Sequence, residues 1–330
     1  MMGTAPPGNG TPTVVVVGDA GLDVVARHRD PLVTGGDTRA RIRMTAGGAG
    51  ANTAAWLARE GVHPVLVARV GDDAAGRQTE TELEAAGVRC AFAVDPDEPT
   101  CCVIVLVDGT GQRTMVPDRG ANARFSPSDV DPAVIDGTAL AGTPGWSAPR
   151  HLHLSGYVLL DASSRDAGLA ALRGARAAGL TTSVDPQAAV LLTREGSEDF
   201  LEAVRGVDLL LPNQDELLAL TGSADPSSAE GLLDLVGAVA VTGGAEGAWW
   251  VDRDGVRGVP APRVECADST GAGDAFDAGV VAAWLRGASA REALAAGVLA
   301  GTEAVRHVGA QPPSATPPVI RSLPEAVGSA

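Results

Sequence analysis

Short apolar runs alternate along this chain with stretches whose apolar residues recur at helical spacing. The first run, Thr13 to Val17, is β-branched and is closed by Gly18, which is typical of a strand buried on both faces. The same criteria predict strands at 64–70, 151–154, 180–184, 207–211 and 238–241, and helices at 51–60, 73–86, 164–178, 214–220, 274–286 and 290–306. This alternation predicts an α/β fold with a doubly wound, mostly parallel sheet flanked by helices.

Two stretches interrupt the alternation, at about residues 22–46 and 89–117. In both, the helical period is lost and strand-like segments are separated by turns such as Asp108-Gly109. Because both leave and rejoin one core, we expect a small β-sheet lid on a single domain at 13–311. The tails, 1–12 and 312–330, are expected to lie outside that domain, the second as a surface strap.

Composition indicates a soluble globular protein. The chain has 330 residues, of which 45% are hydrophobic, which is enough for one large core. No apolar run approaches the roughly 20 residues that cross a bilayer, and the N-terminus has no signal pattern, so we expect a cytoplasmic location. The four cysteines have neither a disulfide-framework spacing nor a metal-ligand spacing, and they are interpreted as reduced, mostly buried thiols.

The charge of the chain excludes several functions. The net charge of −16 opposes nonspecific binding to nucleic acid or anionic lipid. No lysine occurs, so all 25 basic residues are arginine, and this excludes Schiff-base chemistry and every GK[ST] phosphate loop. An anionic substrate must therefore be held by backbone amides, arginines or a divalent metal.

The segment Asp268-Ser-Thr-Gly-Ala-Gly-Asp274 carries the clearest chemical signal. Gly271, Ala272 and Gly273 leave backbone N–H groups uncovered where a helix begins, and the helix dipole adds positive charge there. Asp274 at the rim can accept a proton while the amides stabilise a transferring phosphoryl group. The alternative is a glycine-rich turn capped by an aspartate.

A second set of residues suits a polyhydroxylated ligand. Gly47 and Gly48 permit close backbone approach, and Asn52 offers both a donor and an acceptor. Asp19 and Asp23 follow the first strand at its carboxyl end, where open α/β sheets bind ligands. A tight loop-to-helix connection and turn-capping aspartates are the alternatives.

A third set is suited to metal and nucleotide. Asn213 and Glu216 lie on one face of a first helical turn, where they can organise hydrated Mg²⁺ beside phosphates. The competing interpretation is a capping box. The glycine-rich exit from the strand 238–241, with Thr242, Gly244 and Gly247, is placed to contact a nucleotide.

In their order along the chain, GGAGAN, NQDE, VTGGAEG and DSTGAGDAF resemble the motifs of the PfkB or ribokinase-like family of carbohydrate kinases, from Gly18 to about Gln311. The resemblance implies a ribokinase-like fold with a small β-sheet lid, ATP and Mg²⁺ as cofactors, and transfer of phosphate to a hydroxyl of a sugar or sugar-like molecule. It implies that Asp274 is the general base and that Gly271, Ala272 and Gly273 form the anion hole.

The resemblance also implies further roles. Asn213 and Glu216 would organise Mg²⁺ and phosphates, and Thr242, Gly244 and Gly247 would contact ATP. Asp23, Gly48 and Asn52 would bind the sugar, with Asp19, Gly47 and Arg119 beside them. Asp268 begins a segment that in relatives binds a monovalent cation such as K⁺, and a homodimer through the lid is expected by the same analogy.

Departures from the family pattern leave the substrate open. Ala49 stands where ribokinases proper have lysine and Gly21 where they have asparagine, which puts ribose specificity in doubt. A nucleoside kinase on the same fold is the main alternative, although an aromatic content of 3% disfavours it slightly. A non-catalytic sugar or nucleotide sensor is a remote alternative, and the missing G-x-G-x-x-G excludes a dinucleotide dehydrogenase.

Overall fold

The centre of the fold is strand β1 (Thr13–Val17), which lies inside a large sheet. The computed structural model describes residues 10–110 and 112–313. Within these residues nine strands form one sheet in the order β13-β12-β11-β10-β9-β8-β1-β4-β5, and every neighbouring pair is parallel except β11–β12 and β12–β13. The remaining bounds are β4 His63–Gly71, β5 Arg89–Asp95, β8 Pro149–Ser155, β9 Thr181–Asp185, β10 Leu209–Leu210, β11 Ala238–Thr242, β12 Ala248–Asp252 and β13 Gly255–Val259.

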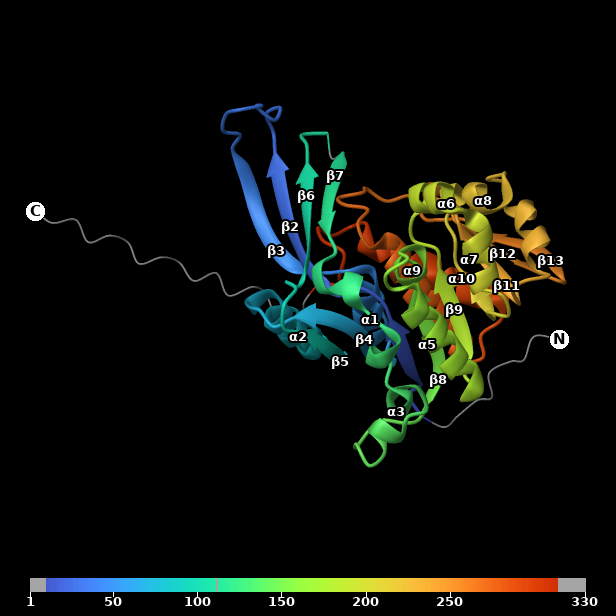
Figure 1. Cartoon of the computed structure of the whole chain (residues 1–330). Helices are drawn as coiled ribbons and strands as arrows, with labels where there is room; N and C mark the ends of the chain where they lie inside the picture. The colour runs from blue at the N-terminus through green and yellow to red at the C-terminus, as the bar shows by residue number, and fades with distance from the viewer. Residues whose placement is uncertain (1–9, 111, 314–330) are drawn as a thin grey trace, which may run out of the picture.

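Helices cover both faces of this sheet (Figure 1), which confirms the predicted fold class. One face packs against α1 (Ala49–Arg59), α2 (Ala74–Ala85), α9 (Ala272–Leu285) and α10 (Ala290–Ala304). The other face packs against α3 (Pro132–Ile135), α4 (Tyr157–Leu160), α5 (Arg165–Ala177), α7 (Ser197–Ala203) and α8 (Gln214–Thr221), with α6 (Ala189–Glu195) beside them.

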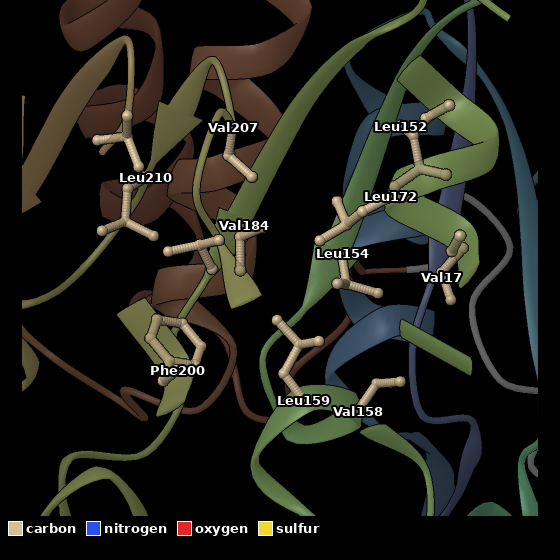
Figure 2. Close-up of a cluster of buried hydrophobic side chains, with 14 of the residues drawn as sticks. Val17, Leu152, Leu154, Val158, Leu159, Leu172, Val184, Phe200, Val207 and Leu210 are labelled. Carbon is tan, nitrogen blue, oxygen red and sulfur yellow. The ribbon is translucent and has the colours of Figure 1, made fainter. Parts of the chain in front are cut away.

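Burial on both faces explains why β1 is a continuous apolar run. Val15 and Val17 point into one core, and Val14 and Val16 into the other, and all four are fully buried. Figure 2 shows part of the first core, where Val17 lies near Leu152 and Leu154 of β8, Leu172 of α5 and the α4 side chains.

A second, smaller sheet stands out from the body (Figure 1). Its order is β3 (Ala40–Gly47), β2 (Gly21–His28), β6 (Cys101–Val107) and β7 (Arg113–Asp118). We call these four strands the small sheet. The predicted excursion at 89–117 needs one correction: residues 89–95 form β5, which pairs in parallel with β4 in the large sheet, so the chain enters the small sheet only at Cys101.

Several elements differ from the sequence prediction. The strands β12 and β13 and the helices α6 and α7 were not predicted. The cysteines, expected to be mostly buried, are buried only at Cys101, whereas Cys90 and Cys102 are half-buried and Cys266 is exposed. The predicted tails 1–12 and 312–330 lie outside the described residues except for 10–12 and 312–313. Over the part of the chain that is described, none of the helices has the length and apolar character needed to span a bilayer.

Candidate active site

The site lies where the direction of chain winding reverses. From β1 the chain passes to β4 and β5 on one side and later to β8, β9, β10 and β11 on the other. The carboxyl ends of parallel strands beside such a reversal are the usual ligand site of an open α/β sheet. The start of α9 meets this edge and closes a cavity of about 170 Å³, lined by Asp185, Gln187, Leu211, Asn213, Glu216, Thr242, Gly271, Gly273, Asp274 and Asp277.

Glycine is required at the entrance to α9. Gly271 is the N-cap residue at φ +73°, and a Cβ there would overlap the carbonyl of Ala310. The N–H of Ala272 donates to Ser269 at 3.4 Å, but no partner is found among the described residues for the N–H groups of Gly273 and Asp274. Open amides at a helix N-terminus can form an anion site, and the N–H of Ala272, which was expected to contribute, is engaged.

Asp274 lies at this anion site, and its carboxylate accepts a hydrogen bond of 3.0 Å from Asn52 Nδ2, a residue 222 positions earlier. Only 8% of Asp274 is exposed. Burial raises the pKa of Asp274 from 3.8 to about 6, while the Asn52 bond acts in the opposite direction. A carboxylate that titrates near neutrality is suited to accept a proton from a hydroxyl.

The residues predicted to bind substrate lie close to one another and form what we call the acceptor wall, although none of them lines this cavity. Asp23 is buried, and burial raises its pKa to about 6. Gly48, at φ +94°, starts α1 and packs against the Asp19 carbonyl, while Gly47 packs against the Asp23 carboxylate. Asn52 Oδ1 is buried and has no partner among the described residues, so it can accept a bond from a ligand hydroxyl.

Arg119 closes that wall from the end of the small sheet. Its guanidinium donates to Asp19 at 3.0 Å and to Asp161 at 2.6 Å. The desolvation of Arg119 works against its charge, but the two carboxylates more than offset this and raise its pKa. Because both guanidinium ends are engaged, Arg119 orients Asp19 in this structure.

At Asn213 and Glu216 the structure shows the capping box, the competing interpretation. The pair forms a capping box on α8, and Asn213 Nδ2 also donates to Glu216 Oε1 at 2.6 Å. Yet both residues line the cavity, and burial raises the pKa of Glu216 to about 7. Thr242 pairs with Asn213 in an isolated bridge and reaches the same cavity.

Two of the predicted nucleotide contacts do not line the cavity, and the predicted cation ligand Asp268 is engaged within its own loop. Gly244 and Gly247 bound the short turn between β11 and β12 and are not among the lining residues of the cavity, and Gly247 packs against the Val259 carbonyl. Asp268 lies in the loop before α9, where its carboxylate accepts bonds from the amides of Thr270 and Gly309.

Sequence reasoning missed four residues of the site. Asp185 and Asp277 are buried in the cavity wall, and burial together with nearby carboxylates raises the pKa of each well above its usual value. Gln187 has the left-handed φ of +72° and donates to Asp185 at 2.6 Å. Tyr157 is the only tyrosine, and burial, with Asp274 and Asp185 nearby, raises its pKa to about 12.

A signal for two of these residues was present. Asp185 directly follows the predicted strand 180–184, much as Asp19 follows the first strand after Gly18, and Asp277 is one helical turn after Asp274. The rule that polar residues at strand ends meet at one edge would have selected Asp185. Gln187 and Tyr157 carry no comparable signal, because their placement depends on the path of the loops after β8 and β9.

Two carboxylates of the cavity are candidate ligands for a hydrated divalent metal. Over the described residues, no group of three or more histidine, cysteine, aspartate or glutamate side chains is arranged to hold a metal ion directly. Mg²⁺ typically takes only one or two carboxylates and keeps several waters. Asp185 and Glu216 offer that number of oxygen ligands.

Comparison with known proteins places the chain among kinases. Residues 11–317 match the description pfkB family carbohydrate kinase. The chain is 31% identical over 300 residues to an ATP-dependent ribose-1-phosphate kinase of Halopiger xanaduensis, covering 89% of this chain and 93% of that protein.

Solved structures of kinases have a similar fold. The fold is similar to an adenosine kinase from Sinorhizobium meliloti, with a TM-score of 0.81, 26% identity, and coverage of 92% of this chain and 96% of the other. It is also similar to a candidate ribokinase II from E. coli in complex with ATP and Mg²⁺, with a TM-score of 0.79, 25% identity and coverage of 91% and 94%.

Proposed function

This chain belongs to the pfkB family of carbohydrate kinases, and from that premise we propose an ATP- and Mg²⁺-dependent kinase that phosphorylates a primary hydroxyl of a sugar or sugar-like molecule. The observation that carries the proposal is the position of Asp274, a buried carboxylate at the open amides of α9 and in contact with Asn52. The similar E. coli protein in complex with ATP and Mg²⁺ supports the choice of cofactors.

The residues of the site then have the following roles. Asn52 and Asp23 orient the acceptor, and Asp274 takes the proton from its hydroxyl as that oxygen attacks the terminal phosphorus of ATP. A bond forms between the acceptor oxygen and phosphorus, and the bond from phosphorus to the ADP oxygen breaks. The open amides of Gly273 and Asp274 stabilise the charge on the transferring group.

Asp185 and Glu216 are the residues that would hold Mg²⁺, with water between Glu216 and the metal because Asn213 already donates to both of its oxygens. When bound, Mg²⁺ neutralises charge on the phosphates. Thr242 would contact the nucleotide from the adjacent strand end, and Gly244 and Gly247 shape the turn behind it.

A nucleoside acceptor is the second candidate, because Tyr157 lies near Asp274 and Asp185 and is an aromatic residue of the kind that stacks on a base. The similar adenosine kinase supports the same candidate. The test is ADP release with ATP, Mg²⁺ and one acceptor at a time: ribose, ribose 1-phosphate, fructose, 2-keto-3-deoxygluconate, adenosine and cytidine. Phosphorylation of an acceptor by the wild type but not by Asp274→Asn supports the proposal, and no phosphorylation of any acceptor contradicts it.

The remaining sequence predictions stay predictions. The small sheet would act as the lid, and its outward face is apolar and exposed at Ile42, Met44, Ile104 and Val116. Such a face suits a second copy of the chain, and Ile42→Glu should convert a dimer to a monomer in sedimentation. Activation by K⁺ at Asp268 and a cytoplasmic location are predicted on the family resemblance and on composition.

A further inference from the structure

Arg113 connects the small sheet to the loop that leads into α9. It lies on β7, the strand of the small sheet drawn nearest α9 in Figure 1. Its guanidinium donates to Ser269 Oγ at 2.7 Å and to Thr270 Oγ1, and it lies 3.4 Å from Asp268 Oδ1. One side chain therefore holds three consecutive residues of the loop.

The loop has Asp268 at its centre. The Asp268 carboxylate accepts bonds from Thr270 N at 3.0 Å, Thr270 Oγ1 at 2.6 Å and Gly309 N at 3.1 Å. Burial disfavours its charge, but these bonds and the Arg113 charge keep the pKa of Asp268 below its usual value. Gly271 and the open amides of α9 follow directly, so the conformation of residues 268–270 sets the direction of those amides.

The face of the small sheet that carries Arg113 also carries Asp23, a residue of the acceptor wall. Arg113 is paired across β6 with Arg27 on β2, and Arg27 donates to the Ala267 carbonyl at 3.4 Å. Asp23 is four residues before Arg27 on β2, so it lies on the same face. One face of the small sheet thus carries an acceptor-site carboxylate and the arginine that holds the loop before the anion site.

We propose that Arg113 is a positioning residue that makes the anion hole depend on the small sheet. It holds residues 268–270 so that the α9 amides point at the transferring phosphoryl group. It does so while the small sheet covers the acceptor. Arg113 touches no reacting atom in this scheme. The inference rests on the proposed function for its effect on catalysis, but the contact itself can be tested without any substrate.

The kinetic test compares Arg113→Met with Arg113→Lys and with Arg41→Met, an exposed arginine on the same face, opposite Arg27. Loss of charged hydrogen bonds should lower kcat of Arg113→Met roughly 10- to 100-fold, with the acceptor KM changed less than about threefold. Lysine should restore only part of kcat, because it lacks the forked donor geometry. A raised KM at unchanged kcat, or an equal loss in Arg41→Met, would overturn the proposal.

The second test is amide hydrogen exchange over residues 266–275 in the protein without ligand. We expect exchange in Arg113→Met to be roughly tenfold faster than in wild type and unchanged in Arg41→Met. Equal exchange in all three proteins would overturn the role of Arg113. Because this measurement needs no acceptor, a wild type that phosphorylates nothing would contradict the proposed function and leave the Arg113 contact to be judged by exchange.

Discussion

Replacing Asp274 with asparagine should abolish most catalysis while making the protein more stable at neutral pH. Only 8% of Asp274 is exposed, and burial raises its pKa from 3.8 to about 6. Asparagine has nearly the same shape and can accept the Asn52 hydrogen bond through its carbonyl oxygen. It cannot carry the negative charge that burial disfavours, nor can it take a proton from a hydroxyl.

The magnitude follows from the linkage between protonation and folding. The difference between 3.8 and about 6 corresponds to roughly 3 kcal/mol. Because the pKa is raised in the folded state, the stability that protonated Asp274 contributes is fully present below about pH 4 and is lost as the pH rises through about 6. At pH 8 the substitution should therefore raise the free energy of unfolding by about 1 to 3 kcal/mol, and at pH 4 the difference should disappear.

The assay is urea unfolding of wild type, Asp274→Asn and Asp37→Asn at pH 4 and pH 8, together with kcat at saturating ATP. Asp37 is exposed and serves as the matched control. We expect kcat of Asp274→Asn to fall by roughly 10² to 10⁴, the range for loss of a general base. An equal stability change at both pH values would refute the electrostatic reasoning, and near-full turnover would refute the assignment of the base.

Three further predictions test other parts of the site. Since Asp274 must lose its proton to act, kcat/KM for the acceptor should rise with pH through about 6 and be constant at higher pH. Initial rates measured from pH 5 to 8 test this, and a kcat/KM that does not change with pH would contradict it. Glu216→Gln should raise the Mg²⁺ concentration for half-maximal activity roughly tenfold, and Asp215→Asn, its exposed neighbour, should leave that concentration unchanged in a Mg²⁺ titration. Gly271→Ala should lower the free energy of unfolding by roughly 2 kcal/mol or more in a melting measurement, because φ is +73° and the added Cβ would overlap the Ala310 carbonyl. Gly273→Ala meets open space, so this variant should fold normally. It should lose kcat in the kinetic measurement.

The core of the fold was predictable because its signals are local. Val14 to Val17 read as a strand buried on both faces, and α5 buries one face through Ala167, Ala171, Leu172 and Ala175. The hairpin of β12 and β13 was not predicted, although Asp254-Gly255 is a turn signal. The strand β5 was assigned to the wrong sheet, since residues 89–95 pair with β4 through contacts that no local pattern encodes.

The site was predictable only as far as short motifs extend. The turn at 271–274 and the pair Asn213 and Glu216 are each contained in a few residues, and both line the cavity. The bond from Asn52 to Asp274 and the contact of Arg113 with Ser269 join residues 222 and 156 positions apart, and nothing in the spacing of either residue specifies its partner. Periodicity locates elements, but such contacts depend on how those elements pack.

The carboxylates themselves give the strongest physical reason to expect a cationic ligand. Asp185, Glu216, Asp274 and Asp277 line one cavity, and burial raises the pKa of each. Their hydrogen-bond donors include the amide groups of Asn52, Asn213 and Gln187, which are neutral and cannot balance four acids. The chain has no lysine to place among them. Crowding these acids destabilises the free protein wherever they are ionised, and under the proposed function a divalent cation bound with its nucleotide would remove that repulsion.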